Sequence, residues 1–377
     1  MAEREARIVH LAAYGGPYPG SFIPMLETAR NAVQSRGWRL EAVFSSGAEH
    51  HAWHSALRER GMQTHVAPNL RLSERTAWVH KLLCRESTVT LLHTHFSEWD
   101  LPAAFAGRTR ASTSVVWHVH TALSDQPVIR MKNLVRFGAV GRLVDRILCV
   151  GPEIRDKAIA RLAPAGRTQL FANAIDVTRF RPREGRDRAL ARAWLDLPDK
   201  TPTLLIFAWN WNVKGGSLLL EAVRELRSQG RDVLAVVVGS EAECRAEAKR
   251  LELESSIRSV APIDDPRVLY AAADIFVAPS SAEGMPWAVL EALSCGIPVI
   301  ASEISAHQYL GRSLPACRVV PLSTLTFSNA IATELDAAPG PRRVRLQESR
   351  TQIEREYSLG QWSTRLIDMY EQLLLGR

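Results

Sequence analysis

Short apolar runs alternate with longer amphipathic stretches along the whole chain. In the first half these runs predict strands at 7–13, 39–45, 63–67, 88–95, 114–119, 146–150 and 168–172. Helical stretches separate them, the first near 22–36 and ending before Gly37. Such alternation predicts βαβ units and a mostly parallel sheet that is covered on both faces.

The alternation restarts after a charge-rich stretch at 181–201. Strands are predicted at 203–208, 233–238, 257–260, 274–278, 297–301 and 317–320, with helices near 216–229, 241–253, 265–273 and 286–295. Two more helical stretches, roughly 341–356 and 360–375, end the chain. We therefore predict an α/β protein with two doubly wound, Rossmann-like domains joined near 175–200. Two such domains facing each other leave a cleft at the carboxyl ends of their strands, where ligands bind.

The composition supports an ordinary globular protein. Of the 377 residues, 46% are hydrophobic and 23% charged, and no stretch approaches the length of a membrane-spanning helix. The first residues mix acids and bases and do not resemble a signal peptide, so we expect a cytoplasmic protein. The five cysteines lie far apart without a C-x-x-C pair, which predicts free, mostly buried thiols and no metal cluster.

The positive charge is concentrated in the first half. Residues 1–180 hold 23 Lys and Arg against 15 Asp and Glu, whereas the remainder holds 24 against 25. Such a field would attract an anionic substrate, a phosphorylated lipid or an acidic membrane surface, and a merely solvated surface is the alternative. Zinc-finger spacing and RNP-like aromatic motifs are absent from the sequence, so no nucleic-acid partner is expected.

The most informative stretch is 273–302, ADIFVAPSSAEGMPWAVLEALSCGIPVIAS. A predicted strand leads into a serine-rich turn, Glu283 falls in the cleft-facing loop, and Glu291 lies eight residues on, within the next helix. Backbone N–H groups of Gly284 and Met285 at the start of that helix would bind phosphate or sugar hydroxyls. The alternative is a loop glutamate and a helix glutamate paired with bases.

Histidines and glycines mark the ends of strands in the first half. His118 and His120 lie on the same side of one predicted strand, and His93 and His95 repeat the arrangement on another. No acidic or cysteine partner shares their spacing, so hydrogen-bonded strand-end residues are expected and no metal. The loop beginning at Gly15–Gly16 lets the backbone approach a ligand, but it is not G-x-G-x-x-G and does not indicate a nicotinamide site.

The stretch 273–302 resembles the E-x7-E signature of the retaining nucleotide-sugar glycosyltransferases of family 4, which have the GT-B fold. Residues 173–180, NAIDVTRF, resemble the family's N-G-V-D-x-x-x-F segment, and the similar pieces follow the family's order across most of the chain. Residues 207–216, FAWNWNVKGG, resemble G-R-L-x-x-x-K-G, in which an arginine and a lysine hold the donor diphosphate. Lys214 matches the lysine and is expected to open a helix. Trp209 occupies the arginine position, and Asn210 is the candidate replacement donor.

The resemblance implies that the two domains bind different substrates. Residues 1–180 would bind the acceptor, 181–358 the nucleotide sugar, and 359–377 would form a helix crossing back to the first domain. Catalytic roles fall on Glu283, His120 and Lys214. Donor binding falls on Gly16, Asn210, Lys214, Glu283, Gly284, Met285, Pro286 and Glu291. Acceptor binding falls on Gly15, Gly16 and His118.

The implied reaction is transfer of a sugar, with retention, from a nucleoside diphosphate sugar to an acceptor hydroxyl. A UDP-sugar is favoured and a GDP-sugar is next. No D-x-D motif occurs in the sequence, and neither metal nor cofactor is expected. The acceptor would be lipid-linked, in cell-surface glycan assembly at the inner face of the membrane, or a small molecule in a natural-product pathway. A non-catalytic sugar-nucleotide-binding subunit is the alternative raised by the missing arginine.

Overall fold

A computed structural model describes residues 5–86 and 88–375 of the chain. The chain divides into two compact units. Unit 1 contains the residues up to Ala174 together with those from Leu359 onward, and unit 2 is Ile175–Ser358. Each unit has its own parallel sheet and its own core, so each is described by itself.

Unit 1 is built on a seven-stranded parallel sheet in the order β3-β2-β1-β4-β5-β6-β7. Its strands are β1 (Ala6–Ala12), β2 (Arg39–Ser45), β3 (Gln63–Ala67), β4 (Val89–His95), β5 (Thr113–Val119), β6 (Arg146–Cys149) and β7 (Thr168–Leu170). Every residue of β1 and β5 is buried, because helices cover both faces of the sheet. The strand order changes direction between β1 and β4.

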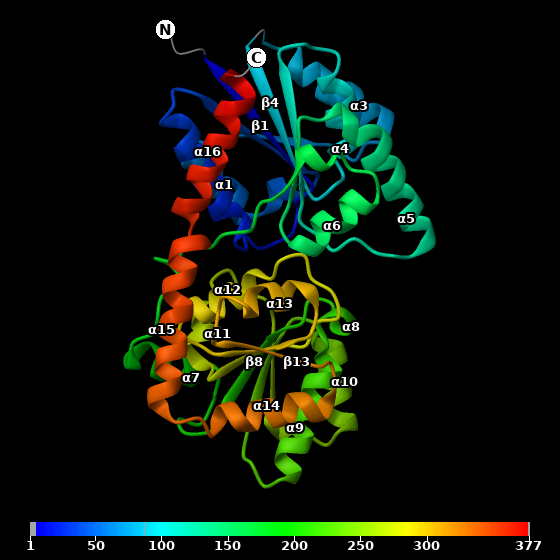
Figure 1. Ribbon diagram of the computed structural model, residues 1–377. Coiled ribbons are helices and arrows are strands. Elements are labelled where there is room, and N and C mark those ends of the chain that lie inside the picture. The colour runs from blue at the N-terminus through cyan, green and yellow to red at the C-terminus, as the bar shows by residue number, and fades with distance from the viewer. Residues whose placement is uncertain (1–4, 87, 376–377) are drawn as a thin grey trace. The chain divides into compact units, whose positions relative to one another are not determined.

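Helices cover the two faces of this sheet in separate groups. They are α1 (Phe22–Gln34), α2 (Ala52–Glu59), α3 (Leu72–Leu83), α4 (Asp100–Gly107), α5 (Pro127–Leu134), α6 (Pro152–Ala160) and α16 (Leu359–Leu375), with short turns η1 (Ala48–His50), η2 (Val135–Ala139), η3 (Val140–Leu143) and η4 (Ala165–Arg167). α16 packs on α1 on one face, and α3 packs on α4 on the other (Figure 1). The C-terminal helix is therefore part of unit 1.

Unit 2 is built on a six-stranded parallel sheet in the order β10-β9-β8-β11-β12-β13. Its strands are β8 (Thr203–Phe207), β9 (Leu234–Val238), β10 (Ile257–Val260), β11 (Ile275–Ala278), β12 (Val299–Ser302) and β13 (Cys317–Val320). Its helices are α7 (Gly185–Trp194), α8 (Trp211–Lys214), α9 (Gly216–Ser228), α10 (Glu241–Arg250), α11 (Arg267–Ala272), α12 (Trp287–Ser294), α13 (Ser305–Gly311), α14 (Thr324–Leu335) and α15 (Pro339–Glu356), with η5 (Glu254–Ser256). α9 packs on α10 and α14, and α7 packs on α11. The strand order changes direction between β8 and β11.

The strands predicted from the sequence are confirmed, each to within two residues at either end. The charge-rich stretch 181–201, for which no helix was predicted, contains the helix α7, which packs on α11 in unit 2. A salt bridge joins the buried guanidinium of Arg192 on α7 to Asp274, and the same group donates to the Ala272 carbonyl. Because charged groups make this contact, hydrophobic periodicity did not reveal it. α13 and α14 were also not predicted.

Two further expectations concern cysteines and membrane spans. All five cysteines are free thiols, four of them buried and Cys84 exposed, as predicted. Across residues 5–86 and 88–375, no helix combines the length and the apolarity that crossing a bilayer requires.

Candidate active site

In unit 2, loops from two neighbouring strands meet where the strand order changes direction. β8 leads into α8, and β11 leads into the loop 279–286. Parallel strands end at the same edge of a sheet, so the two loops lie together, and the Ser281 amide donates to the Val213 carbonyl at 2.8 Å. Such a switch point is where open α/β sheets bind ligands. This edge of unit 2 therefore holds the candidate donor site.

Lys214 and Glu283, two of the predicted catalytic residues, form an ion pair at this edge. The Lys214 Nζ lies 2.6 Å from Glu283 Oε1, and the Ser280 hydroxyl donates to the same oxygen at 2.8 Å. Both charged side chains are partly buried. An ammonium group beside a carboxylate and a hydroxyl offers one partner for phosphate oxygens and others for sugar hydroxyls.

The helix predicted near 216–229 is confirmed as α9 with Gly215 as its N-cap, but Lys214 does not open it. Lys214 ends the short helix α8, and α9 begins at Gly216. Gly215 between them has φ +72°, the left-handed region, and a Cβ there would lie 2.2 Å from the Pro279 carbonyl oxygen. The break between the helices thus lets the backbone after Lys214 close onto the loop that carries Glu283.

The residues just after β8 show how α8 begins. Asn210 is the N-cap of α8, and its side-chain oxygen accepts from the Val213 amide at 3.2 Å. Trp209, in the position of the expected arginine, exposes 52% of its surface and lies against the turn at Gly239, which has φ +84°. Asn210 therefore has a capping function, and its role toward a diphosphate stays a prediction.

The rest of the predicted donor site lies along the same loop and helix. Met285 is buried, and Pro286 is the N-cap of α12, which begins one residue later than predicted. Gly284, between Glu283 and Met285, is partly buried. Glu291 is buried inside α12 and accepts a hydrogen bond of 2.7 Å from the Tyr270 hydroxyl. Glu291 is thus bonded to Tyr270 of α11, and its predicted contact with ribose stays a prediction.

Three residues that sequence reasoning missed extend the pair into the core of unit 2. The Ser302 hydroxyl donates to the Ser280 carbonyl and lies 3.1 Å from Nδ1 of the buried His307. Burial lowers the pKa of His307, and the nearby Glu283 carboxylate partly opposes that shift. Serines directly after β11 and at the end of β12 were the only sequence signal, and serines are common in such turns.

In unit 1, the predicted residues lie at the switch point between β1 and β4. The His51 ring is 3.0 Å from the Gly15 carbonyl, and the Trp53 indole donates to the Gly16 carbonyl at 2.9 Å. A Cβ on Gly16 would meet nothing within 4 Å among the described atoms, so this stretch of backbone is open. The backbone at Gly16 therefore has open space beside it, and the ligand contacts of Gly15 and Gly16 stay predictions.

His118 and His120 belong to a cluster of five buried histidines in unit 1. The members come from β1, β4 and the end of β5: His10, His93, His95, His118 and His120. The rings of His118 and His120 are 4.1 Å apart, and those of His93 and His95 are 4.4 Å apart. The prediction of hydrogen-bonded histidines at strand ends is confirmed, but His10 and the tyrosine Tyr370 of α16, which joins them, were missed.

Burial keeps these imidazoles neutral. Desolvation lowers the pKa of His10 and of His118 to about 3, and it lowers the pKa of His93, His95 and His120 well below 6.5. Two sets of three ring nitrogens lie within 4.8 Å, close enough to be considered as metal ligands. The nitrogens instead bond to one another, and no carboxylate among the described residues is available to offset a buried divalent charge, so a metal fits poorly.

In comparisons with known proteins, each half of the chain matches a glycosyltransferase family model. Residues 25–179 match the family described as Glycosyltransferase Family 4, and residues 201–335 match Glycosyl transferases group 1. The crystal structure of Anabaena HepE in complex with UDP superposes with a TM-score of 0.82 at 18% identity, covering 97% of this chain and 100% of that one. This likeness shows the GT-B fold, with its two parallel-sheet α/β domains.

Two curated relatives were also compared. A D-inositol 3-phosphate glycosyltransferase of Catenulispora acidiphila is 29% identical over 57% of this chain and 55% of its own length. An Escherichia coli UDP-Gal:alpha-D-GlcNAc-diphosphoundecaprenol alpha-1,3-galactosyltransferase is 25% identical over 68% and 69%. The chain spans about half the length of several curated relatives that it matches. The chain belongs to glycosyltransferase family 4, a family of transferase enzymes.

Proposed function

We propose that this protein is a retaining glycosyltransferase that moves a sugar from a nucleoside diphosphate sugar to an acceptor hydroxyl. The observation that carries the proposal is the Lys214–Glu283 ion pair of 2.6 Å at the β8/β11 switch point of unit 2. In support of the proposal, a cation that would hold the diphosphate lies beside a carboxylate that would hold the sugar, and diphosphate and sugar are the two parts of the donor that separate in the reaction. His120, at the end of β5, is proposed to contact the donor sugar.

The proposed chemistry needs only the donor, the acceptor and groups of this chain. The acceptor oxygen bonds to the anomeric carbon on the face from which the diphosphate departs, and the glycosyl–phosphate bond breaks. The acceptor proton passes to an oxygen of the departing phosphate. Negative charge grows on that phosphate, and Lys214 would stabilise it. Glu283 would hold sugar hydroxyls while positive charge develops on the ring.

A UDP-sugar is the proposed donor. Calorimetric titration with UDP, GDP, dTDP and ADP should show one nucleotide, with UDP expected, binding with equal affinity in the presence of Mg²⁺ and of EDTA. Adding the matching sugar nucleotide and an acceptor should then release the nucleotide. Binding without release for every acceptor would favour the non-catalytic binding subunit, and no binding of any nucleotide would contradict the donor site.

The proposed acceptor is lipid-linked and is met at an anionic membrane surface. In support, helix α5 is exposed at every position from Pro127 to Lys132. Val128 and Met131 on α5 and Val135, the first residue of η2 directly after it, are exposed at 68%, 62% and 55%. The α5 cations Arg130 and Lys132 form no ion pair within the described chain. A helix that presents apolar and basic side chains together suits the headgroup region of an anionic bilayer.

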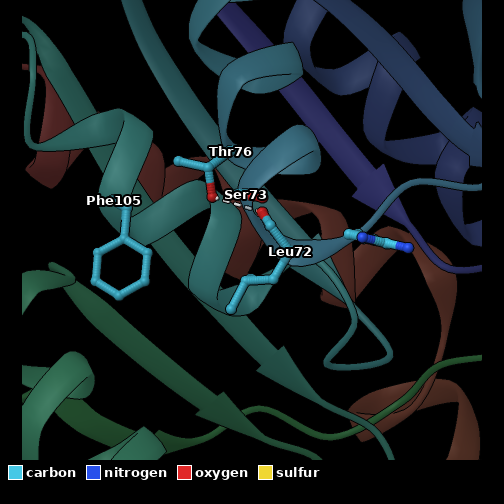
Figure 2. Close-up of a pocket in the computed structure, with 5 residues that line it drawn as sticks. Leu72, Ser73, Thr76 and Phe105 are labelled. Atoms are coloured by element: carbon cyan, nitrogen blue, oxygen red, sulfur yellow. Dashed lines mark hydrogen bonds between the residues drawn. The ribbon is translucent and has the colours of Figure 1, made fainter.

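The same face of unit 1 carries a second apolar feature. α3, α4 and α5 lie on one side of the sheet (Figure 1), and a pocket opens between α3 and α4. Figure 2 shows Leu72 and Phe105 at this pocket beside the hydroxyl residues Ser73 and Thr76. Both large side chains are exposed. This pocket is a place for an acyl chain of a lipid whose headgroup meets the cations of α5.

Replacing Met131 and Val135 by serine should weaken binding to vesicles that contain phosphatidylglycerol by about tenfold, because two exposed apolar side chains no longer enter the headgroup region. Co-sedimentation with anionic and with purely zwitterionic vesicles measures this binding. A matched control replaces the exposed Leu325 and Val344 of unit 2 by serine. Equal binding by the α5 variant and the control would contradict the membrane surface and favour a small-molecule acceptor.

A further inference from the structure

The histidine cluster of unit 1 includes buried, hydrogen-bonded residues to which the proposed reaction gives no role. His10 lies within β1 and Tyr370 lies on α16, and both are fully buried. Neither belongs to the loops that the proposed function assigns to donor or acceptor. Burying polar rings costs free energy unless their nitrogens form hydrogen bonds. The pattern of these bonds therefore determines which nitrogen of each ring carries the proton.

The pairing forms one continuous chain of hydrogen bonds. In order, the links are His93 Nδ1 to Tyr370 OH at 2.6 Å, Tyr370 OH to His10 Nε2 at 2.9 Å, His10 Nδ1 to His95 Nε2 at 2.9 Å, and His95 Nδ1 to His120 Nε2 at 2.9 Å. A neutral imidazole has one N–H and one lone pair, and a hydroxyl has one proton to donate. Each bond therefore fixes the next, and the whole chain has only two polarities.

The two ends of the chain select the same polarity. At one end, His93 Nε2 is buried and has no hydrogen-bond partner within residues 5–86 and 88–375. An orphaned buried N–H is rarer than an orphaned acceptor, so this nitrogen carries the lone pair and Nδ1 carries the proton. At the other end, His120 Nδ1 and Asn173 Oδ1 are both buried, and an interaction with the Asn173 side chain favours the protonated form of His120, as expected when a ring N–H faces an amide oxygen.

We infer that Tyr370, His10 and His95 are positioning residues that fix the tautomer of His120. Every proton in the chain points from His93 toward His120, so all four linked histidines carry their proton on Nδ1. His120 then carries its N–H at Nδ1, toward Asn173, and has no lone pair there. Nδ1 of His120 therefore cannot take a proton from an acceptor hydroxyl. The role toward substrate rests on the proposed function, whereas the tautomer does not.

His118 provides an internal reference for this inference. It lies outside the chain, with its Nε2 3.4 Å from the Phe171 carbonyl oxygen. A carbonyl only accepts, so His118 should carry its proton on Nε2. In the full-length protein labelled with ¹⁵N-histidine, long-range ¹H–¹⁵N spectra at pH 8 should therefore show Nδ1–H for His10, His93, His95 and His120, and Nε2–H for His118. Nε2–H forms for the four linked histidines would overturn the inference.

Tyr370→Phe removes only the hydroxyl that joins His10 to His93. The expected result is a weaker preference for Nδ1–H, with a measurable Nε2–H fraction at His10, His95 and His120, because only the contact of His120 with Asn173 then favours one polarity in that segment. Ser114→Ala is the matched control, since the Ser114 hydroxyl also donates to α16, at the Leu373 carbonyl, but lies outside the chain. An unchanged His120 signal in the tyrosine variant would refute the coupling.

Kinetics of the same variant separate this inference from the proposed function. If His120 contacts the donor sugar, Tyr370→Phe should lower kcat about three- to tenfold while the affinity for the nucleotide alone stays unchanged. Unchanged kcat together with altered tautomers would support the coupling along the hydrogen-bonded chain and refute the proposed contact of His120 with the donor sugar.

Discussion

Lys214→Ala is expected to lower kcat/KM for the donor about 10²–10³-fold, the usual loss when one group that stabilises a departing anion is removed. The ammonium group lies 2.6 Å from Glu283 at the β8/β11 edge, where the diphosphate is proposed to bind. Affinity for the nucleotide should fall about 10- to 100-fold, because a charge-assisted contact is lost. Steady-state kinetics and calorimetry measure the two effects separately.

The control for this change is Lys249→Ala. Lys249 is an exposed lysine on α10 of the same unit, so its loss alters net charge equally without touching the site. Glu283→Gln gives a second comparison, since it keeps the size of the side chain and removes its charge. We expect it to lower kcat far more than nucleotide affinity. If Lys214→Ala left nucleotide affinity intact, the diphosphate would have to lie elsewhere.

That Lys214 and Glu283 lie at the same sheet edge could be predicted from the sequence, because both follow strands of a parallel sheet. β8 and β11 are buried apolar runs, and Pro279 directly follows β11, so their ends are easy to locate. Loops that follow neighbouring parallel strands lie at the same edge of the sheet, so their proximity follows from the strand order. What the sequence could not reveal was the break at Gly215, because a left-handed glycine and the start of a helix are both typical of Lys-Gly-Gly.

The histidine chain shows the opposite case. His93, His95, His118 and His120 attract attention as pairs spaced by two, but His10 is a single polar residue in an apolar strand. Its partner Tyr370 lies 360 positions away and meets it only because α16 packs back onto unit 1. Local patterns carry no information about contacts of such separation. The same holds for α7, whose arginines meet carbonyls and Asp274 instead of an apolar core.

Unit 1 is expected to become less stable as the pH falls from 7 to 5. Burial holds the pKa of His10 and His118 at about 3 and that of His93, His95 and His120 well below 6.5. The unfolded chain, with histidine pKa values near 6.5, binds protons between pH 7 and pH 5, whereas the folded unit does not. The free energy of unfolding is therefore highest above about pH 7 and falls as the pH drops.

The loss comes to about 2 kcal/mol each for His10 and His118 between pH 7 and pH 5, and His93, His95 and His120 act in the same direction. Carboxylates contribute little in this window, because most titrate below it. Hydrogen exchange of β1, β4 and β5 against urea at pH 5, 6, 7 and 8 measures the effect within unit 1 alone. His118→Phe should reduce the loss, since it removes one of the buried bases and keeps a ring in place. His50→Gln, at an exposed histidine, should leave the loss unchanged. Equal protection of these strands at pH 5 and pH 7 would mean that the cluster accepts protons in the folded state, which its burial without a carboxylate partner opposes.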